Sequence, residues 1–440
     1  MSIASLAEER FKEILRSNLT PAKAISDPVH LRGRAKLLKQ IDWAFNSPGK
    51  HAFIYGERGV GKTSLAQTAA LLHSSSEARP IQIACDEYVT FYKMVSDIAR
   101  RALPPQDVMQ RSVTNRTGKL SLFGFSAELQ TGIQKGVIPP VESLNDAVVL
   151  LQYVAGLHHG EPVLIIDEFD QVRDREDQKR FADLIKQISD QNVSLKLIFC
   201  GIGQSLEDLI GVHLSTDRYL APIPVEPLSH DALWEILETT ADQLGVEVGR
   251  EEKVRISQIS DGFPYYVHLI GEHMFRSMFY DEALVERVGL RHFDEGMRGA
   301  VSEALASLKQ AYLMAVHKRS DDYEEVLWAV ADDTMLERQT AEIYSRSYLP
   351  IMEMRNLKLK RDEQRAPLDQ KTFYQRMNAL KRASHGQILI GSKTGWYRFR
   401  ENWMRGYVRL KAEQKGVALG IDHHLAERPP HRRWDGPDAA

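Results

Sequence analysis

Short, continuously apolar runs alternate with longer stretches of helical spacing through residues 30–225. The apolar runs occupy residues 51–55, 80–85, 162–167 and 195–200. Runs of this length without polar alternation are typical of strands in a parallel sheet that is covered on both faces. Residues 63–72 and 146–157 have the spacing of helices and lie between these runs. Alternation of strands and helices predicts a doubly wound α/β domain.

The pattern changes after Ser229, where the strand signals stop. Residues 230–245 predict a helix that ends at a glycine, and helical patterns continue to about residue 318 with a sharp break at residues 262–264. After about residue 320, two helical patterns precede a third helix, which we expect Thr372 to cap with Gln375 completing a capping box. Two strand-like runs then flank a Gly-rich turn, at residues 387–390 and 396–399.

These shifts divide the chain into five predicted parts. They are a lead-in with an amphipathic helix over residues 5–16, an α/β core, a helical lid, a C-terminal domain and a disordered tail, at 1–29, 30–228, 229–318, 319–415 and 416–440. A polar stretch at about 103–140 reads as an insertion in the core, with a hairpin through residues 119–129.

Composition narrows the class of protein. The 440 residues are 43% hydrophobic and 27% charged, which excludes a wholly disordered or collagen-like chain. Cys85 and Cys200 are the two cysteines and both lie in apolar runs, so a disulfide-stapled secreted fold is not expected. No apolar stretch is long enough to cross a bilayer, and the N-terminus does not resemble a secretory signal. We therefore expect a cytoplasmic protein without a membrane partner.

The sequence between residues 56 and 63 carries the most specific motif. It reads Gly56, Glu57, Arg58, Gly59, Val60, Gly61, Lys62, Thr63, and Ser64 continues into the predicted helix. An apolar strand before G-x-x-x-x-G-K-T and a helix after it are the context of a phosphate-binding loop. Its backbone N–H groups form an anion nest, in which Lys62 reaches the β- and γ-phosphates and the Thr63 hydroxyl can ligate Mg²⁺. A Gly-rich turn without a ligand is the alternative.

An acidic pair at the end of the 162–167 strand provides the partner that such a loop requires. Asp167 is expected to hold Mg²⁺, and Glu168 to act as the general base that polarises the attacking water. The acids that follow, at 170, 174, 176 and 177, read as a solvated helix start rather than a metal cluster.

With these motifs the chain resembles the AAA+ ATPases, in particular the branch of origin-recognition initiators, transposition regulators and STAND signalling ATPases. The resemblance implies that Arg34, in a Gly-Arg pair upstream of the loop, lies beside the adenine. It also implies that Gln204, after the 195–200 strand, is the sensor-1 residue. Arg218 stands where these families carry an arginine finger, although in a monomer it would be a solvated surface arginine. Pro264 belongs to a Gly-x-Pro turn like that of STAND proteins, in place of the sensor-2 arginine of the initiators.

The C-terminal domain resembles a winged helix, which initiators also pair with an AAA+ core. Residues 367–416 hold 11 Lys or Arg against 3 Asp or Glu, in a chain whose net charge is −3. A local basic excess on a helix and wing suits phosphate contacts, for which the candidates are Arg376, Lys393, Arg398 and Arg400. Winged helices also dock proteins, and that alternative stays open. The paired His423 and His424 in the tail read as solvated.

The sequence thus predicts an α/β P-loop core, a helical lid and a C-terminal winged helix. The expected activity is ATP hydrolysis with ATP and Mg²⁺, in a homo-oligomeric switch on duplex DNA. The alternative is a signalling or scaffold ATPase that recruits an unidentified protein partner without DNA.

Overall fold

The computed structural model of the chain describes residues 3, 6–74, 80–102, 140–157, 160–212, 214–283, 285–391 and 393–420. It separates into two compact units. Unit 1 comprises 1–248, 262–268 and 283–287, and unit 2 comprises 249–261, 269–282 and 288–440. The predicted hairpin at 119–129 and the pair at 423–424 lie outside the described residues, as does most of the 103–140 insertion. The five-part division itself stays a prediction.

Unit 1 is built on a parallel sheet in the order β2-β3-β4-β1-β5. Its strands are β1 (His51–Gly56), β2 (Ile81–Ala84), β3 (Val163–Asp167), β4 (Lys196–Gly201) and β5 (Leu220–Val225). The first four confirm the four apolar runs of the sequence. The sheet is parallel throughout and β1 lies between β4 and β5, so the carboxyl ends of β1 and β3 reach the same edge, with β4 between them.

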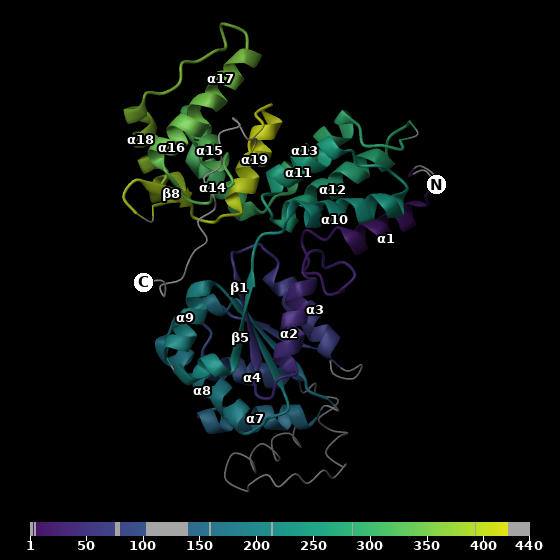
Figure 1. Cartoon of the computed structure of the whole chain (residues 1–440), viewed down its shortest axis with the longest axis vertical. Helices are drawn as coiled ribbons and strands as arrows, with labels where there is room; N and C mark the ends of the chain where they lie inside the picture. Colours follow the sequence, from purple (N-terminus) through teal and green to yellow (C-terminus); the bar gives the residue numbers. More distant parts are fainter. Residues whose placement is uncertain are drawn as a thin grey trace. The chain divides into compact units, whose positions relative to one another are not determined.

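Helices and short 3₁₀ turns precede or connect these strands, as Figure 1 shows. They are α2 (Ala35–Phe45), α3 (Lys62–His73), α4 (Phe91–Ala102), α7 (Leu144–Gly156), η2 (Phe169–Gln171), α8 (Arg175–Asp190), α9 (Gly203–Val212) and η3 (Leu214–Arg218). Asp174 caps α8 by accepting a hydrogen bond from the Glu176 N–H, which confirms that this acidic stretch starts a helix. The core between sheet and helices is apolar and rich in aromatic rings.

Two further helices belong to unit 1. The amphipathic α1 (Glu8–Asn18) buries Phe11, Ile14 and Leu15, and it joins α10 (His230–Leu244) through a 2.9 Å bond from Asn18 Nδ2 to Gln243 Oε1. Gly245 ends α10 in the left-handed conformation, as the sequence predicts.

Unit 2 is mainly helical. It contains α11 (Arg250–Ser260), the greater part of α12 (Pro264–Phe279), α13 (Leu290–Glu303), α14 (Ala306–Val316), α15 (Asp322–Ala331), α16 (Thr340–Glu342), η4 (Ile343–Tyr348), α17 (Leu349–Lys358), α18 (Gln370–Ala379), η5 (Ala383–His385) and α19 (Met404–Gln414). Three short strands form an antiparallel sheet in the order β6-β8-β7: β6 (Arg338–Gln339), β7 (Leu389–Ile390) and β8 (Trp396–Phe399). The β7–β8 hairpin was predicted, whereas the two-residue β6 was not.

Two local predictions in unit 2 are wrong. The cap of α18 is Asp369, whose carboxylate accepts hydrogen bonds from both the N–H and the hydroxyl of Thr372, so Thr372 lies inside the helix. The disorder predicted from residue 416 is wrong for residues 416–420, because Val417 and Leu419 are buried and the Gly420 N–H donates to Asp332 Oδ1 at 3.1 Å. Helix α18 starts earlier than predicted because Asp369 caps it. The ordered chain continues past residue 416 because Val417 and Leu419 are buried and Gly420 is hydrogen-bonded.

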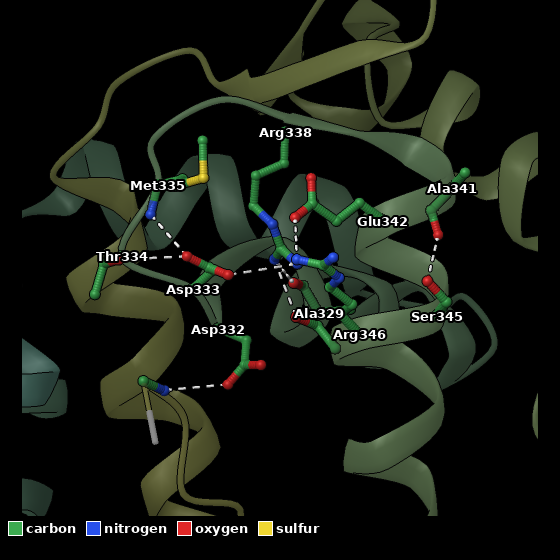
Figure 2. A network of polar contacts seen from close by, with 12 residues as sticks. Ala329, Asp332, Asp333, Thr334, Met335, Arg338, Ala341, Glu342, Ser345 and Arg346 are labelled. Carbon is green, nitrogen blue, oxygen red and sulfur yellow. Dashed lines mark hydrogen bonds and ion pairs between the residues drawn. The ribbon is translucent and has the colours of Figure 1, made fainter. Parts of the chain in front are cut away.

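Buried arginines hold unit 2 together. Figure 2 shows the Arg338 guanidinium beside Asp333, with 3.6 Å from Nη2 to Oδ2, and the Met335 N–H donates to the other oxygen of that carboxylate. Arg405 and Arg409 of α19 are also buried, and both contact the Asp261 carboxylate, at 3.2 and 3.0 Å. These side chains are structural, because each guanidinium group pairs with acceptors inside unit 2.

Candidate functional site: the phosphate loop and its acidic strand

The loop after β1 has the backbone that a phosphate nest requires. Gly59 and Gly61 have φ of 86° and 95°, a region that favours glycine. A Cβ at Gly56 would lie 2.2 Å from the Val225 carbonyl oxygen, so only glycine fits where β1 passes the end of β5. The loop then enters α3 at Lys62, which places the helix N-terminus beneath the nest. Glu57 and Arg58 lie on the turn of the loop, with Arg58 exposed.

Lys62 folds back over its own loop. Its ammonium donates to the carbonyl oxygens of Gly56 and Glu57, both at 3.0 Å. Burial lowers the pKa of Lys62, and the nearby acids, Asp170 and Asp167 among them, act in the opposite direction. Among the described residues, the ammonium donates to these two neutral carbonyls, and such a cation is well suited to exchange them for charged phosphate oxygens, which form stronger hydrogen bonds.

Thr63 and Asp167 meet although 104 residues separate them. The Thr63 hydroxyl donates to Asp167 Oδ2 at 2.8 Å. The same carboxylate accepts from Gln82 Nε2 at 3.1 Å, and its other oxygen accepts the Glu168 N–H at 2.9 Å. A hydroxyl and a carboxylate at this separation are the hard oxygen donors that Mg²⁺ prefers, so the two side chains fit the ion.

Glu168 is exposed beside the buried Asp167 and has a left-handed backbone, with φ 53° and ψ 38°. The next residue explains why this conformation is held. Phe169 is buried against Phe181 and Phe199, with ring centroids 5.3 and 5.2 Å away, so the chain must turn at Glu168 to place that ring in the core. A strained residue at a strand end is typical of functional sites.

Arg34 ties the loop to the exit of β5. Its Nη2 donates to the Val60 carbonyl at 2.9 Å and to the Glu226 carbonyl at 2.7 Å. Burial lowers the pKa of Arg34 to about 10, so the guanidinium stays charged at neutral pH. Gly33 before it has φ 67°, and a Cβ there would meet Ala232 Cβ at 2.6 Å.

The Gly-x-Pro turn also lies in unit 1. The Leu228 N–H donates to the Gly262 carbonyl at 2.8 Å, and a Cβ on Gly262, whose φ is 80°, would lie 2.5 Å from Pro227 Cβ. Pro264 is the first residue of α12, where a missing N–H is harmless. Ser64 accepts a hydrogen bond from the Ile25 N–H at 3.1 Å, so its hydroxyl anchors the lead-in segment.

The two trans-acting or sensing candidates do not contact these groups in the described structure. Gln204 is exposed on α9 and donates to Asp208 Oδ1 on the same helix at 3.0 Å. Arg218 ends η3 with a side chain that is 64% exposed, 3.9 Å from Asp190 Oδ1 and against the Tyr219 ring. Both the solvated and the finger interpretations of Arg218 remain predictions.

The candidate nucleic-acid residues divide into two kinds. Lys393 and Arg400 are exposed on the hairpin and Arg398 is half-buried. Arg376 differs, because its Nε donates to Asp322 Oδ2 at 2.7 Å and its guanidinium lies over the Tyr323 ring. The basic excess of residues 367–416 therefore overstates the free surface charge. Arg405 and Arg409 are buried, and Arg376 is held inside the unit.

Sequence reasoning missed Gln82 of β2. Its Nε2 donates to Asp167 Oδ2, the same oxygen that Thr63 of α3 contacts, and its Oε1 accepts a hydrogen bond from Gln67 Nε2 of α3 at 2.6 Å, so it helps to orient the carboxylate. A polar residue in an apolar run was the only signal in the sequence. The contact between Gln82 and Asp167 depends on the pairing of β2 with β3, which brings Ala84 opposite Asp167.

The chain is similar to known proteins in one domain and in its fold. The model of the AAA ATPase domain matches residues 30–198. No curated protein matches the chain. A solved Walker-type ATPase of Pyrococcus abyssi is similar over 88% of this chain and 99% of its own, with a TM-score of 0.53 and 18% identity. Cdc6p of Pyrobaculum aerophilum covers 93% of this chain and 99% of its own, at TM-score 0.42 and 13% identity. The Aeropyrum pernix Orc1 protein, solved with DNA, covers 88% and 95%, at 0.41 and 14%.

The first of these structures shows a shared fold, and the family model shows an ATPase domain. The chain is therefore an ATPase with a parallel α/β core of the P-loop kind. Among the described residues, no helix combines the length and apolar character that a bilayer span needs.

Proposed function

We propose that this ATPase uses Mg²⁺–ATP to switch an oligomer that associates with duplex DNA. The observation that carries the nucleotide part is the 2.8 Å bond between Thr63 Oγ1 and Asp167 Oδ2, which joins the phosphate loop to the acidic strand. In the bound state Mg²⁺ would neutralise charge on the β- and γ-phosphate oxygens. Thr63 and Asp167 would hold the ion, and Lys62 would bind phosphate oxygen.

Glu168 is the general base of this proposal. Its carboxylate is exposed, and its backbone is fixed by the Asp167 and Phe169 contacts on either side. The fixed backbone presents the carboxylate at the carboxyl end of β3, from where it can accept a proton from the attacking water. Arg218 acts in trans in this proposal. Its exposed position on unit 1 supports that role, since a finger must be presented to a neighbouring copy.

The DNA part rests on the hairpin of unit 2, which we interpret as the wing of a winged helix. α15, β6, the α16–α17 stretch, α18 and the β7–β8 hairpin follow one another in the order of that fold. Lys393, Arg398 and Arg400 supply cations on the hairpin. Arg376 is no longer a candidate for phosphate contact, because its guanidinium is bound to the Asp322 carboxylate. Phosphates of a duplex are the ligands such a hairpin fits.

A neutral polar groove beside the hairpin supports the same assignment. Its volume is about 300 Å³, and Tyr374, Asn378, Thr394 and Tyr397 are among its lining residues. Tyr397 donates its hydroxyl to Asn378 Oδ1 at 2.9 Å, which fixes the amide and leaves its Nδ2 donors for a base edge. Side-chain amides are the groups that read adenine in a major groove.

The second candidate is an ATP-controlled scaffold that recruits a protein through unit 2. The observation in its favour is on α17, where Leu357 and Met354 are 80% and 38% exposed. Exposed apolar side chains on one helix are typical of protein-docking faces. DNA-dependence of the ATPase distinguishes the two candidates.

The test compares wild type with the triple variant Lys393→Ala, Arg398→Ala, Arg400→Ala. Duplex binding is titrated with salt by fluorescence anisotropy, and ATPase rate and oligomer mass are measured with and without duplex. Each lost phosphate contact should flatten the plot of log affinity against log salt by about 0.9, so the triple variant should flatten it by up to about 3. Basal ATPase without DNA should not change.

A matched control removes three exposed cations elsewhere in unit 2, Lys358, Lys360 and Arg361. If the hairpin variant and this control bind duplex as tightly as wild type and with the same salt slope, the hairpin does not touch DNA. If duplex also leaves the wild-type ATPase rate and mass unchanged, the scaffold candidate replaces the proposal.

A further inference from the structure

A basic groove lies in unit 2, on elements other than the hairpin. Its volume is about 590 Å³, and it is formed by the end of α13, by α14, by the 317–321 connection, by α15 and by α19. The lining includes five Lys or Arg side chains against two acids. They are Lys309, Lys318, Arg319, Lys411 and Lys415 against Asp321 and Glu324.

Both acids of this groove are neutralised by other groups. Asp321 forms an ion pair with Arg365, which is not part of the lining. Glu324 is nearly buried and accepts from the Tyr312 hydroxyl and from Lys415. The acids therefore contribute no net negative charge to the groove once these pairs are made.

Four of the cations have no carboxylate partner among the described residues. Lys309 donates to the Ser302 carbonyl, and Arg319 donates to the carbonyls of Met314 and Ser384. Lys318 is exposed on the 317–321 connection and has a left-handed backbone, with φ 55°. The chain therefore turns at this residue. Neutral acceptors do not compensate the positive charge of a cation. The groove therefore has an excess of positive charge, which attracts anions.

Lys411 is the most informative of the four. Its side chain is half-buried between the walls of the groove, and its ammonium donates to Gln414 Oε1 at 3.1 Å. Burial lowers the pKa of Lys411, Glu324 raises it, and the neighbouring Lys415 lowers it again. A half-buried ammonium with one neutral acceptor is unusual, because a desolvated charge is ordinarily paired.

The floor and one wall of the groove are apolar. Tyr312 and Tyr407 are both buried and pack edge-to-face, with ring centroids 5.4 Å apart, which makes the floor rigid. Leu313 is 53% exposed on the wall formed by α14. Apolar surface with a few converging charges, in a volume of several hundred Å³, is the usual make-up of a small-ligand site.

We propose that this groove binds the phosphate groups of a nucleotide unit, either in a nucleic-acid strand or as a free nucleotide. Lys309, Lys318 and Lys411 contact the phosphates, and Leu313 packs against the sugar or base. The site is distinct from the phosphate loop, which lies in unit 1, and from the hairpin cations. It stands whether or not the hairpin binds DNA.

The test uses the full chain with Lys62→Ala, which disables the phosphate loop as a competing phosphate site. Two probes separate the sources of phosphate: a fluorescein-labelled 20-nucleotide oligo-dT, and a fluorescent N-methylanthraniloyl ADP. The test variant adds Lys309→Gln and Lys411→Gln, which keep polar, flexible side chains one atom shorter than lysine and remove two charges. The control adds Lys36→Gln and Lys39→Gln, two exposed lysines of α2 in unit 1.

We expect at least one probe to bind and the Lys309/Lys411 variant to weaken that probe about tenfold or more. For oligo-dT the salt slope should fall by about 1.4, since each single-strand contact contributes about 0.7. The α2 control should bind as the parent does. A bound probe should also protect Lys411 from acetylation by an amine-reactive ester, read by mass spectrometry.

Equal affinities and slopes for the groove variant and the α2 control, with both probes, would overturn the proposal. Unprotected Lys411 in the presence of saturating probe would do the same. Because the variant could lose its fold, far-ultraviolet circular dichroism and the melting temperature are compared first. If the double variant melts early, Lys318→Glu, at an exposed position, replaces it and must itself weaken the probe.

Discussion

Arg34 offers the sharpest test of how the phosphate loop is held. Arg34→Met keeps the apolar length of the side chain but removes the guanidinium that donates to the Val60 and Glu226 carbonyls. Both bonds come from a charged donor, and such bonds contribute about 1.5–3 kcal/mol each. We expect the low end of their sum, about 3 kcal/mol, because the variant no longer buries a charge.

The loss should extend to nucleotide binding, since Val60 belongs to the loop itself. Without its bond to Arg34 the free loop adopts more conformations. Ordering the loop around phosphate then costs more conformational entropy, which lowers the affinity for ATP. Even half of the lost free energy, about 1.5 kcal/mol, corresponds to an ATP affinity that is more than tenfold weaker. Arg34→Lys should fall between wild type and methionine, because one ammonium cannot reproduce the fixed geometry of a guanidinium.

The assay is urea unfolding by circular dichroism, fitted for the transition of unit 1, together with calorimetric ATP titration. Arg10→Met is the control, because Arg10 makes only an exposed pair with Glu13 on α1, and such pairs contribute a few tenths of a kcal/mol. If Arg34→Met unfolds at the urea concentration of wild type and binds ATP equally well, the clamp between loop and β5 has no energetic role.

Three further outcomes follow from the site and the core. Glu168→Gln should retain bound ATP while hydrolysis stops, because an amide cannot accept the proton of water; single-turnover hydrolysis at the wild-type rate would refute the base. Arg218→Ala should bind ATP normally yet turn over about 10³-fold more slowly, and mixing it with Lys62→Ala should restore some activity if the arginine acts in trans. Burial lowers the pKa of His51 to about 3 and that of His268 to about 4, so the unfolded chain takes up protons below about pH 6.5 while the folded chain does not. Stability should therefore fall as the pH is lowered from 6.5, by about 2 kcal/mol per histidine at pH 5, and a flat profile of urea midpoint against pH would contradict this.

The sequence was sufficient where one local pattern determines one local structure. Four apolar runs became four parallel strands, and the glycines of residues 56–61 occupy the positions where their backbone freedom is needed. Thr63 and Asp167 could be paired in advance because the motif requires the contact, whatever the number of residues between them.

Contacts that depend on packing between distant segments could not be predicted. Gln82 donates a hydrogen bond to Asp167 only because β2 pairs with β3. The residues of the two strands do not predict this pairing or its register. The C-terminal arginines show the opposite error. Arg376, Arg405 and Arg409 were counted with a basic face, whereas carboxylates at 322 and 261 bind them inside unit 2. Charge along a sequence therefore gives an upper limit to charge on a surface.

The left-handed backbone at Glu168 places activity and stability in opposition at a single residue. An L-residue with a side chain costs about 1–2 kcal/mol more than glycine in this region of backbone space. Glu168→Gly should therefore relax the strand end and raise the melting temperature, at the same position where we expect loss of the carboxylate to abolish hydrolysis. Selection of variants of this chain for heat resistance alone would drift towards an inactive enzyme, unless ATP turnover is selected as well.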